Sequence, residues 1–351
     1  MIESSAIAVG VAVLMLILVL VLVVLAQFRR PPLMVATGFK AVLITGCDQG
    51  FGYMLAKRLD GAGYKIFAGC LDAEGEGAVT LQKEASPKLE VIQLDVTQDD
   101  QVEKARVTVV DSLEGRVLWA VVNNAGMASH VEFELTPKAH FRKMVDVNLI
   151  GLVNVTRAFL PLIRATRGRV INISSMAGRT GVPGFTAYSA SKYGVVGFSE
   201  CLRREMVHFG VKVILVEPFI YKTAMGTARN VVNQNDNFWE MADPGIRRDY
   251  GEYFFSQTQE ARRTLMMGGA IKKLNEAIDC LEDAVSSPSP CLRYVPPWHM
   301  KFLNDLLSLL PFTIQDYILH RITLIRSKPY MVMPVENGGG PRAGRRRSHA
   351  L

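Results

Sequence analysis

Tyr188 and Lys192 are the residues whose types and spacing most clearly predict chemistry. They stand four positions apart in Tyr188-Ser-Ala-Ser-Lys192, so on a helix they share one face. A free tyrosine has a pKa of about 10 and is a poor base at neutral pH, but a neighbouring ammonium favours the phenolate. Ser175 lies 13 residues before the tyrosine, and its hydroxyl can hold an oxygen on which charge develops. Together the three side chains predict removal of a proton from an alcohol.

Oxidation of an alcohol also releases a hydride, which a nicotinamide can accept. A glycine-rich stretch, Thr45–Gly52, follows the apolar run Ala41–Ile44 and precedes the helical pattern of Tyr53–Leu59. A strand, a glycine turn and a helix in this order can bind a phosphate, because backbone N–H groups and the helix N-terminus point toward it. Such turns are also common as plain connections, so the stretch alone does not decide the matter. We expect cofactor contacts from Thr45, Gly46, Asp48, Gln49, Gly50, Phe51 and Gly52.

Two further groups fall where a dinucleotide site needs them. Small and amide residues at the end of a strand can line the cofactor crevice, and Asn123, Ala125 and Gly126 follow the apolar run Ala120-Val121-Val122. Asp95, with Val96 beside it, ends another apolar run and is placed to contact an adenine amine.

Short apolar runs alternate with helical stretches from Lys40 onward. This alternation predicts an α/β fold, in which a doubly wound parallel sheet of the Rossmann type carries helices on both faces. We expect a single domain over residues 40–334. The predicted strands are Ala41–Ile44, Lys65–Ala68, Glu90–Leu94, Leu118–Val122, Arg169–Ile173 and Lys212–Val216.

Residues 6–26, after a stub of residues 1–5, are 21 uncharged and mainly apolar residues. As a helix they would cross a hydrocarbon core of about 30 Å. A cleaved signal peptide is the alternative, but the stub has no basic residue and no clear small-residue cleavage site follows. Arg29 and Arg30 follow the apolar segment, which places the remainder on the cytoplasmic side. We expect a single-pass transmembrane anchor and a linker over residues 27–39.

The pattern weakens after Pro218. Residues 221–262 are polar, aromatic and basic, and we expect a helical lid over the substrate, with aromatic side chains lining an apolar pocket. Residues 300–325 form an apolar C-terminal helical extension, equally consistent with core or dimer packing and with contact to a membrane surface. Residues 335–351 are rich in Gly and Arg, which predicts a disordered basic tail.

The net charge of +7 is unevenly distributed. The first forty residues carry +2 and the last eleven carry +4, so the body between them is almost neutral. A neutral body argues against a nucleic-acid partner. The five cysteines are scattered without a CxxC pair, so we expect neither a metal site nor a disulfide framework.

The ordered motifs resemble those of the short-chain dehydrogenase/reductase family over about residues 40–225. The resemblance implies that Asn148 joins Ser175, Tyr188 and Lys192 as a fourth catalytic residue, which bends a helix and holds a water in a proton relay to the lysine. It implies that Ser175 and Tyr188 also contact the substrate, and it suggests a homodimer or homotetramer. The remaining cofactor contacts implied are Tyr188, Lys192, Pro218 and Thr223.

The choice between NAD and NADP depends on the end of the second strand. Family members that prefer NAD often carry an acidic residue there, whereas this chain has Gly69, and the nearest acid is Asp72. No Lys or Arg stands at Gln49 or at 69–72, and Asp48 and Asp72 would repel a 2′-phosphate. We therefore expect NAD, with NADP less favoured. The usual Pro-Gly after the last strand is Pro218-Phe219 here, which predicts an altered substrate preference.

Local sequences such as Phe67–Leu71, Asn172–Met176 and Arg293-Tyr294 resemble the branch of retinol, 17β-hydroxysteroid and D-β-hydroxybutyrate dehydrogenases. The apolar segment favours a lipophilic alcohol or ketone, of retinol or steroid type, taken from the bilayer. The alternative is D-3-hydroxybutyrate, whose carboxylate would need a cation such as Lys222 or Arg179. A second alternative is a non-catalytic nucleotide-binding scaffold. We expect the endoplasmic reticulum membrane, with a mitochondrial membrane as the alternative.

Overall fold

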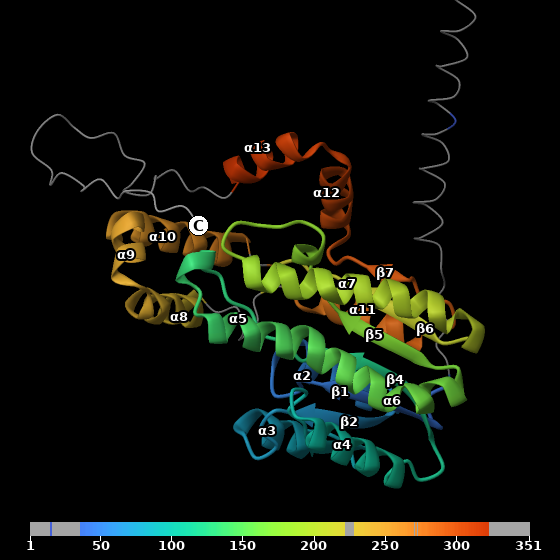
Figure 1. The fold of residues 1–351 in the computed structure, drawn as a ribbon. Coiled ribbons are helices and arrows are strands. Elements are labelled where there is room, and N and C mark those ends of the chain that lie inside the picture. The colour runs from blue at the N-terminus through green and yellow to red at the C-terminus, as the bar shows by residue number, and fades with distance from the viewer. Residues whose placement is uncertain (1–14, 16–35, 222–227, 270, 272, 323–351) are drawn as a thin grey trace, which may run out of the picture.

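The computed structural model describes residues 15, 36–221, 228–269, 271 and 273–322 (Figure 1). The expected stub, linker residues 27–35 and basic tail lie outside these ranges, as does Thr223. Of the expected anchor only Met15 is described, and it is helical and exposed.

A sheet of seven parallel strands organises the domain, in the order β3-β2-β1-β4-β5-β6-β7. The chain first builds outward from β1 on one side and then returns to build outward on the other, so the winding reverses between β1 and β4. Ligands of open parallel sheets bind at such a reversal, beyond the carboxyl ends of the strands. The strands are β1 (Lys40–Thr45), β2 (Lys65–Cys70), β3 (Leu89–Gln93), β4 (Val117–Asn123), β5 (Arg169–Ile173), β6 (Lys212–Val216) and β7 (Arg293–Tyr294).

The six predicted strands are confirmed, each with bounds within two residues of the prediction. β7 was not predicted, because two residues show no periodicity. It extends the sheet beyond β6, and the backbone N–H of Glu217 donates to the Tyr294 carbonyl at 2.8 Å.

Alternate residues of each strand face opposite helical layers, which confirms the doubly wound arrangement. Val42 and Ile44 of β1 face one layer, while Ala41 and Leu43 face the other. The first layer comprises α2 (Gly50–Gly61), α3 (Glu76–Glu84) and α11 (Asn275–Ser286). The second comprises α4 (Asp99–Asp111), α6 (Leu152–Thr166) and α7 (Thr186–Met206).

One long helix runs from Lys138 to Thr166, through α5 (Lys138–Val145), a π-helical turn at Asp146–Gly151, and α6. Within the described ranges it is the one helix long and apolar enough to cross a membrane by length and composition. Val155, Phe159 and Ile163 of this helix are fully buried against the sheet. Each such side chain stabilises the fold by about 2 kcal/mol, so this is a core helix of the domain.

Residues 228–269 form three helices, α8 (Ala228–Met241), α9 (Pro244–Tyr250) and α10 (Glu252–Gly269), at the left of Figure 1. Their aromatic residues gather among themselves. Phe238 and Phe255 pack with Val131 and Leu135, and the Trp239 ring stacks on Phe255 with centroids 4.4 Å apart. This segment therefore packs against Val131 and Leu135 in a small hydrophobic cluster that is separate from the two clusters on the sheet.

The chain then adds α12 (Trp298–Leu309) and α13 (Phe312–Ile322), which lie at the top of Figure 1, while α3 and α4 lie at the bottom. These two helices correspond to the predicted apolar extension. They leave large apolar side chains exposed, among them Phe302, Leu309 and Phe312.

Candidate active site

One cavity of about 1230 Å³ extends from the glycine turn after β1 to α12 and α13. Such a volume suits a cofactor together with a substrate. Its lining brings together most of the residues predicted from the sequence: Gly46, Asp48, Gln49, Gly50, Phe51, Asp72, Asp95, Val96, Ala125, Gly126, Ser175, Tyr188, Lys192 and Pro218.

The glycine turn is too close to its neighbours to accept side chains. Gly46 and Gly50 have φ angles of +69° and +67°, which favour glycine. A Cβ at Gly46 would lie 2.8 Å from the Ala125 Cα, and one at Gly52 would lie 2.3 Å from the Gly46 carbonyl oxygen. The buried Thr45 hydroxyl accepts from the Ala125 N–H at 2.9 Å. Thr45 and Gly52 thus shape the turn without lining the cavity.

Asn123 lies away from the cavity, contrary to the prediction. Its amide donates to Thr156 at 2.9 Å and to Asn172 at 2.8 Å, and its side chain is buried between the sheet and α6. Asn124 is the lining residue instead, and its amide donates to the carbonyls of Thr45 and Gly46, both at 2.9 Å. The reason is the two-residue period of a strand, which sends neighbouring side chains to opposite faces.

Two carboxylates lie at the end of the cavity beside β2. Asp48 accepts the backbone N–H groups of Leu71 and Asp72 at 3.0 and 3.1 Å, so it fixes the chain where β2 ends. The strand continues one residue past Gly69 to the buried Cys70, so Gly69 does not close it. Among the described lining residues from Gly46 to Thr97 there is no Lys or Arg.

Tyr188 and Lys192 lie one turn apart on α7, beside Ser175. The Lys192 ammonium donates to the Ile173 carbonyl at 2.9 Å and lies 5.8 Å from the centre of the Tyr188 ring. Burial lowers the pKa of Lys192 to about 8. Burial raises the pKa of Tyr188, and its hydrogen bond with Ser175 opposes that rise. The pKa of Tyr188 is therefore raised in this structure, whereas the sequence predicted that Lys192 would lower it.

Asn148 lies in the π-helical turn between α5 and α6, a type of bulge that often marks functional positions. Its amide oxygen accepts from the Met127 N–H at 2.8 Å, and its nitrogen donates to the Met127 carbonyl and to the Ser191 hydroxyl, both at 2.9 Å. The local helix distortion agrees with the expectation from the resemblance. Ser191 is buried on the face of α7 that carries Lys192, and the sequence analysis missed it.

The far end of the cavity is apolar, but its lining differs from the prediction. Of the described residues in 221–262, Tyr221 lines the cavity, but beside the glycine turn, where its ring meets Phe51 edge-on with centroids 5.5 Å apart. The predicted aromatic lining from this segment is thus found at Tyr221, whereas Phe238, Trp239 and Phe255 do not line the cavity, because they pack together with Val131 and Leu135. The apolar wall consists of Met300, Leu303, Leu306, Leu307, Leu310, Ile318 and Leu319, on or between α12 and α13.

Aromatic residues border the space next to Tyr188. Phe185 lies with its ring centre 5.8 Å from that of Tyr188 and stacks on His130 at 3.9 Å. Burial lowers the pKa of His130 to about 3, so this imidazole is neutral at physiological pH. Phe219, which stands where a glycine is usual in the resembled family, also lines the cavity.

Of the two cations considered for a carboxylate substrate, the structure describes only Arg179. Arg179 does not line the cavity, and its guanidinium lies 2.6 Å from the Asp305 carboxylate. Lys222 lies outside the described residues. The lining contains the exposed Arg142 and Lys143 on α5, and Lys192 beside Tyr188.

Comparison with known proteins places this geometry in a family. The profile described as short chain dehydrogenase matches residues 40–233. A 17-beta-hydroxysteroid dehydrogenase type 6 from Bos taurus is 40% identical over 302 residues, covering 85% of this chain and 93% of that protein. Retinol dehydrogenase 16 from Homo sapiens is 37% identical over 285 residues, covering 81% and 89%.

Solved structures share the fold. A short-chain dehydrogenase from Streptomyces avermitilis superimposes with a TM-score of 0.63 at 24% identity, covering 82% of this chain and 98% of that one. One from Burkholderia cenocepacia J2315, in complex with NADP, gives 0.60 at 23% identity, covering 81% and 98%. From the profile match and the two relatives we conclude that the chain belongs to the short-chain dehydrogenase family and is an oxidoreductase of alcohols.

Proposed function

We propose that this protein is a membrane-anchored, NAD-dependent dehydrogenase that oxidises a primary or secondary alcohol of a lipophilic substrate, of retinol or steroid type. One observation carries the proposal. A single cavity joins the glycine turn and Tyr188 to an apolar wall on α12 and α13. The hydroxyl of a long apolar alcohol can therefore reach Tyr188 while its hydrocarbon part is removed from water.

The residues around the glycine turn fit a dinucleotide. The close approach at Gly46 and Gly52 leaves backbone N–H groups and the N-terminus of α2 as the polar surface for a pyrophosphate. Asp95, which accepts from the Thr97 N–H and hydroxyl at 2.9 and 2.7 Å, is held in place to contact an adenine amine. A bound nicotinamide supplies the hydride acceptor.

Two observations support NAD over NADP. Asp72 is exposed at the cavity edge, and the Asp48 carboxylate lies against the backbone N–H of the same residue. A phosphate on the ribose would meet two negative charges with no Lys or Arg among the described lining residues from Gly46 to Thr97. The two hydroxyls of an unmodified ribose can instead donate to a carboxylate.

Each of the four proposed catalytic residues would have its own role: two would transfer the proton and two would hold other groups in position. Tyr188, neutral because burial raises its pKa, must lose its own proton before it can accept the one from the substrate hydroxyl. Lys192, whose pKa is lowered to about 8, can receive or return a proton near neutral pH. Ser175, which hydrogen-bonds to Tyr188, would hold the substrate oxygen. Asn148 would fix the backbone at Met127 and the α7 turn that holds Ser191.

Membrane anchoring by residues 6–26 suits such a substrate. Retinoids and steroids partition into bilayers, and a linker over 27–39 would keep the cavity close to one. The exposed Phe302, Leu309 and Phe312 on the helices of the apolar wall are consistent with that proximity. The hydroxy-acid alternative loses support, because Arg179 is paired with Asp305 and does not face the cavity.

Turnover of an all-trans retinol, a 17β-hydroxysteroid and D-3-hydroxybutyrate should be compared on the full chain in detergent or liposomes, with NAD and with NADP. We expect NAD-dependent oxidation of at least one of the two lipids and a kcat/KM with NADP at least tenfold lower. If the protein oxidises the hydroxy acid but neither lipid, the substrate assignment is overturned. A preference for NADP would overturn the cofactor assignment.

A further inference from the structure

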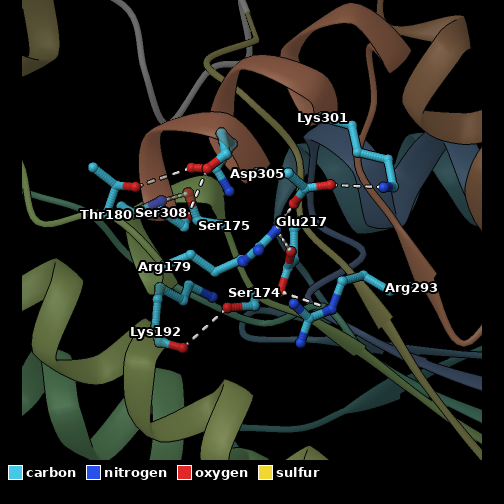
Figure 2. Close-up of polar contacts among 12 residues, drawn as sticks. Ser174, Ser175, Arg179, Thr180, Lys192, Glu217, Arg293, Lys301, Asp305 and Ser308 are labelled. Atoms are coloured by element: carbon cyan, nitrogen blue, oxygen red, sulfur yellow. Dashed lines mark hydrogen bonds and ion pairs between the residues drawn. The ribbon is translucent and has the colours of Figure 1, made fainter. Parts of the chain in front are cut away.

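Glu217 is a charged residue that the proposed proton transfer does not use. It is the first residue after β6, and its side chain is fully buried. Neither carboxylate oxygen receives a hydrogen bond from the described residues, and the nearest cations are Arg293 at 3.6 Å and Arg179 at 3.9 Å (Figure 2). A buried carboxylate that has two distant ion pairs but accepts no hydrogen bond from the described residues is costly, so its position calls for an explanation.

Glu217 directly precedes a residue of the cavity lining. The next residue, Pro218, lines the cavity, and its carbonyl accepts from the Met176 N–H at 3.3 Å. Met176 follows Ser175 and opens the tight turn that leads to Arg179, whose N–H donates to the Met176 carbonyl at 3.0 Å. The backbone at Glu217 and the turn after Ser175 are thus held against each other.

Two consecutive residues of that turn bind two consecutive residues of α12. Arg179 pairs with Asp305 at 2.6 Å, and the Thr180 hydroxyl donates to the Asn304 side chain at 3.0 Å (Figure 2). Thr180 and Asn304 are both buried. The same helix contributes Leu303, Leu306 and Leu307 to the apolar wall. A displacement of this wall would therefore reach the Ser175 turn through Arg179 and Thr180.

We infer that Arg179 is a positioning residue, shared between Asp305 on α12 and the buried Glu217, that couples the apolar wall of the cavity to the position of Ser175. The inference rests on the proposed function, in which the substrate binds against the apolar wall and Ser175 holds the oxygen that reacts. It means that part of the binding free energy of a long substrate is used to align the Ser175 hydroxyl. A short alcohol that does not reach α12 gains nothing from this coupling.

The test compares kcat and KM for a long lipophilic alcohol and for a short one such as cyclohexanol, with Asp305→Asn, Asp305→Glu and Arg179→Met. We expect Asp305→Asn to lower kcat for the long alcohol about tenfold with KM changed less than threefold, and to leave the short alcohol within twofold. Asp305→Glu should recover most of the loss. Adding Arg179→Met to Asp305→Asn should cause little further loss, because both remove the same link.

Lys301→Met is the matched control. Lys301 pairs with the same Asp305 carboxylate at 2.7 Å from one turn earlier on α12, but it does not contact the Ser175 turn. It should leave kcat for both alcohols within twofold. The inference is overturned if Asp305→Asn raises only KM, if it lowers kcat equally for both alcohols, or if Lys301→Met has the same effect.

Hydrogen exchange in residues 174–181 separates this inference from the proposed function, because it needs no turnover. Asp305→Asn should speed amide exchange in that segment at least tenfold, and Lys301→Met should not. Unchanged exchange in Asp305→Asn overturns the coupling whatever the substrate proves to be. If the wild type oxidises neither alcohol but exchange is still faster in Asp305→Asn than in the wild type, the coupling is supported and the proposed function is contradicted.

Discussion

The Asn148 amide donates to the Ser191 hydroxyl at 2.9 Å, and Ser191 in turn donates to the Tyr188 carbonyl at 2.7 Å. The π-helical turn on one helix is thereby joined to the turn of α7 that carries the proposed base. Because Asn148 also satisfies the N–H and the carbonyl of Met127, a single amide holds three segments together beside Tyr188.

Asn148→Ala should therefore affect both stability and turnover. It leaves the N–H and the carbonyl of Met127 without this partner and removes the hydrogen bond that the Ser191 hydroxyl accepts, which costs about 3 kcal/mol of unfolding free energy. We expect kcat to fall more than tenfold as well. Urea unfolding and steady-state turnover are the measurements. Asn154→Ala, on α6 with an exposed bond to Asp99 at 2.9 Å, is the control and should change stability by less than about 0.5 kcal/mol. Wild-type stability and kcat in Asn148→Ala would refute this account.

Tyr188→Phe removes the proposed base while keeping the ring that packs beside Phe185. We expect kcat to fall by about 10²- to 10⁴-fold, the usual contribution of a general base. The dissociation constant for NAD, measured by calorimetry, should stay within about threefold. Tyr193→Phe, on the same helix but half-exposed, should keep nearly full activity. If Tyr188→Phe turns over normally, another group is the base.

Glu217 should make stability depend on pH in a defined direction. Burial raises its pKa to about 7, against the opposing effect of Arg293 and Arg179, while Asp305 and Glu200 raise it slightly further. A carboxyl with a raised pKa binds its proton more tightly in the folded state. Its contribution to stability is complete below about pH 4.5 and is lost as the pH rises through 7.

Glu217→Gln removes this titration, so it isolates the contribution. Between pH 5 and 8 the unfolding free energy of the wild type should fall relative to that of Glu217→Gln, by up to about 3 kcal/mol. Urea unfolding at several pH values provides the comparison. If the difference in unfolding free energy between the two proteins stays constant, or if the wild type gains stability relative to the variant as the pH rises, the carboxylate is charged over the whole pH range.

The apolar wall can be probed on α12 with two leucines two residues apart. Leu307 lines the cavity, whereas Leu309 is 82% exposed and does not. Leu307→Ser should raise KM for a lipophilic alcohol about tenfold, since it removes roughly 1–2 kcal/mol of apolar contact. Leu309→Ser should change KM less than twofold, and NAD affinity should be unchanged in both. Equal effects of the two substitutions would argue that substrate does not bind at this wall.

Much of the fold could be predicted from the local pattern of residue types. The alternation along β1, with Ala41 and Leu43 on one face and Val42 and Ile44 on the other, is visible in the residue types because both faces are buried. The glycine turn and the Tyr188–Lys192 pair could be recognised because each consists of a few residues that are close together in the sequence. The structure therefore placed these residues together as expected.

What the sequence did not reveal depends on contacts between distant segments. The two-residue period of β4 could have shown that Asn123 lies away from the cavity, because Asn123 lies on the same face of the strand as the buried Val121, whereas Asn124 follows on the other side. By contrast, nothing near Glu217 indicates that Arg293 and Arg179 approach it across more than 35 residues of chain on either side. The apolar pattern of 300–325 likewise predicts helices but not the surface they cover, because amphipathicity does not specify a partner.

The most direct test of the central claim follows the hydride. A lipophilic alcohol deuterated at the carbinol carbon should be incubated with NAD and either the full chain or its Tyr188→Phe variant, and the NADH analysed by mass spectrometry. The account predicts one deuterium in each NADH made by the wild type, and almost no labelled NADH from the variant. Labelled NADH at equal rates from both proteins, or label from D-3-hydroxybutyrate but from no lipophilic alcohol, would contradict it.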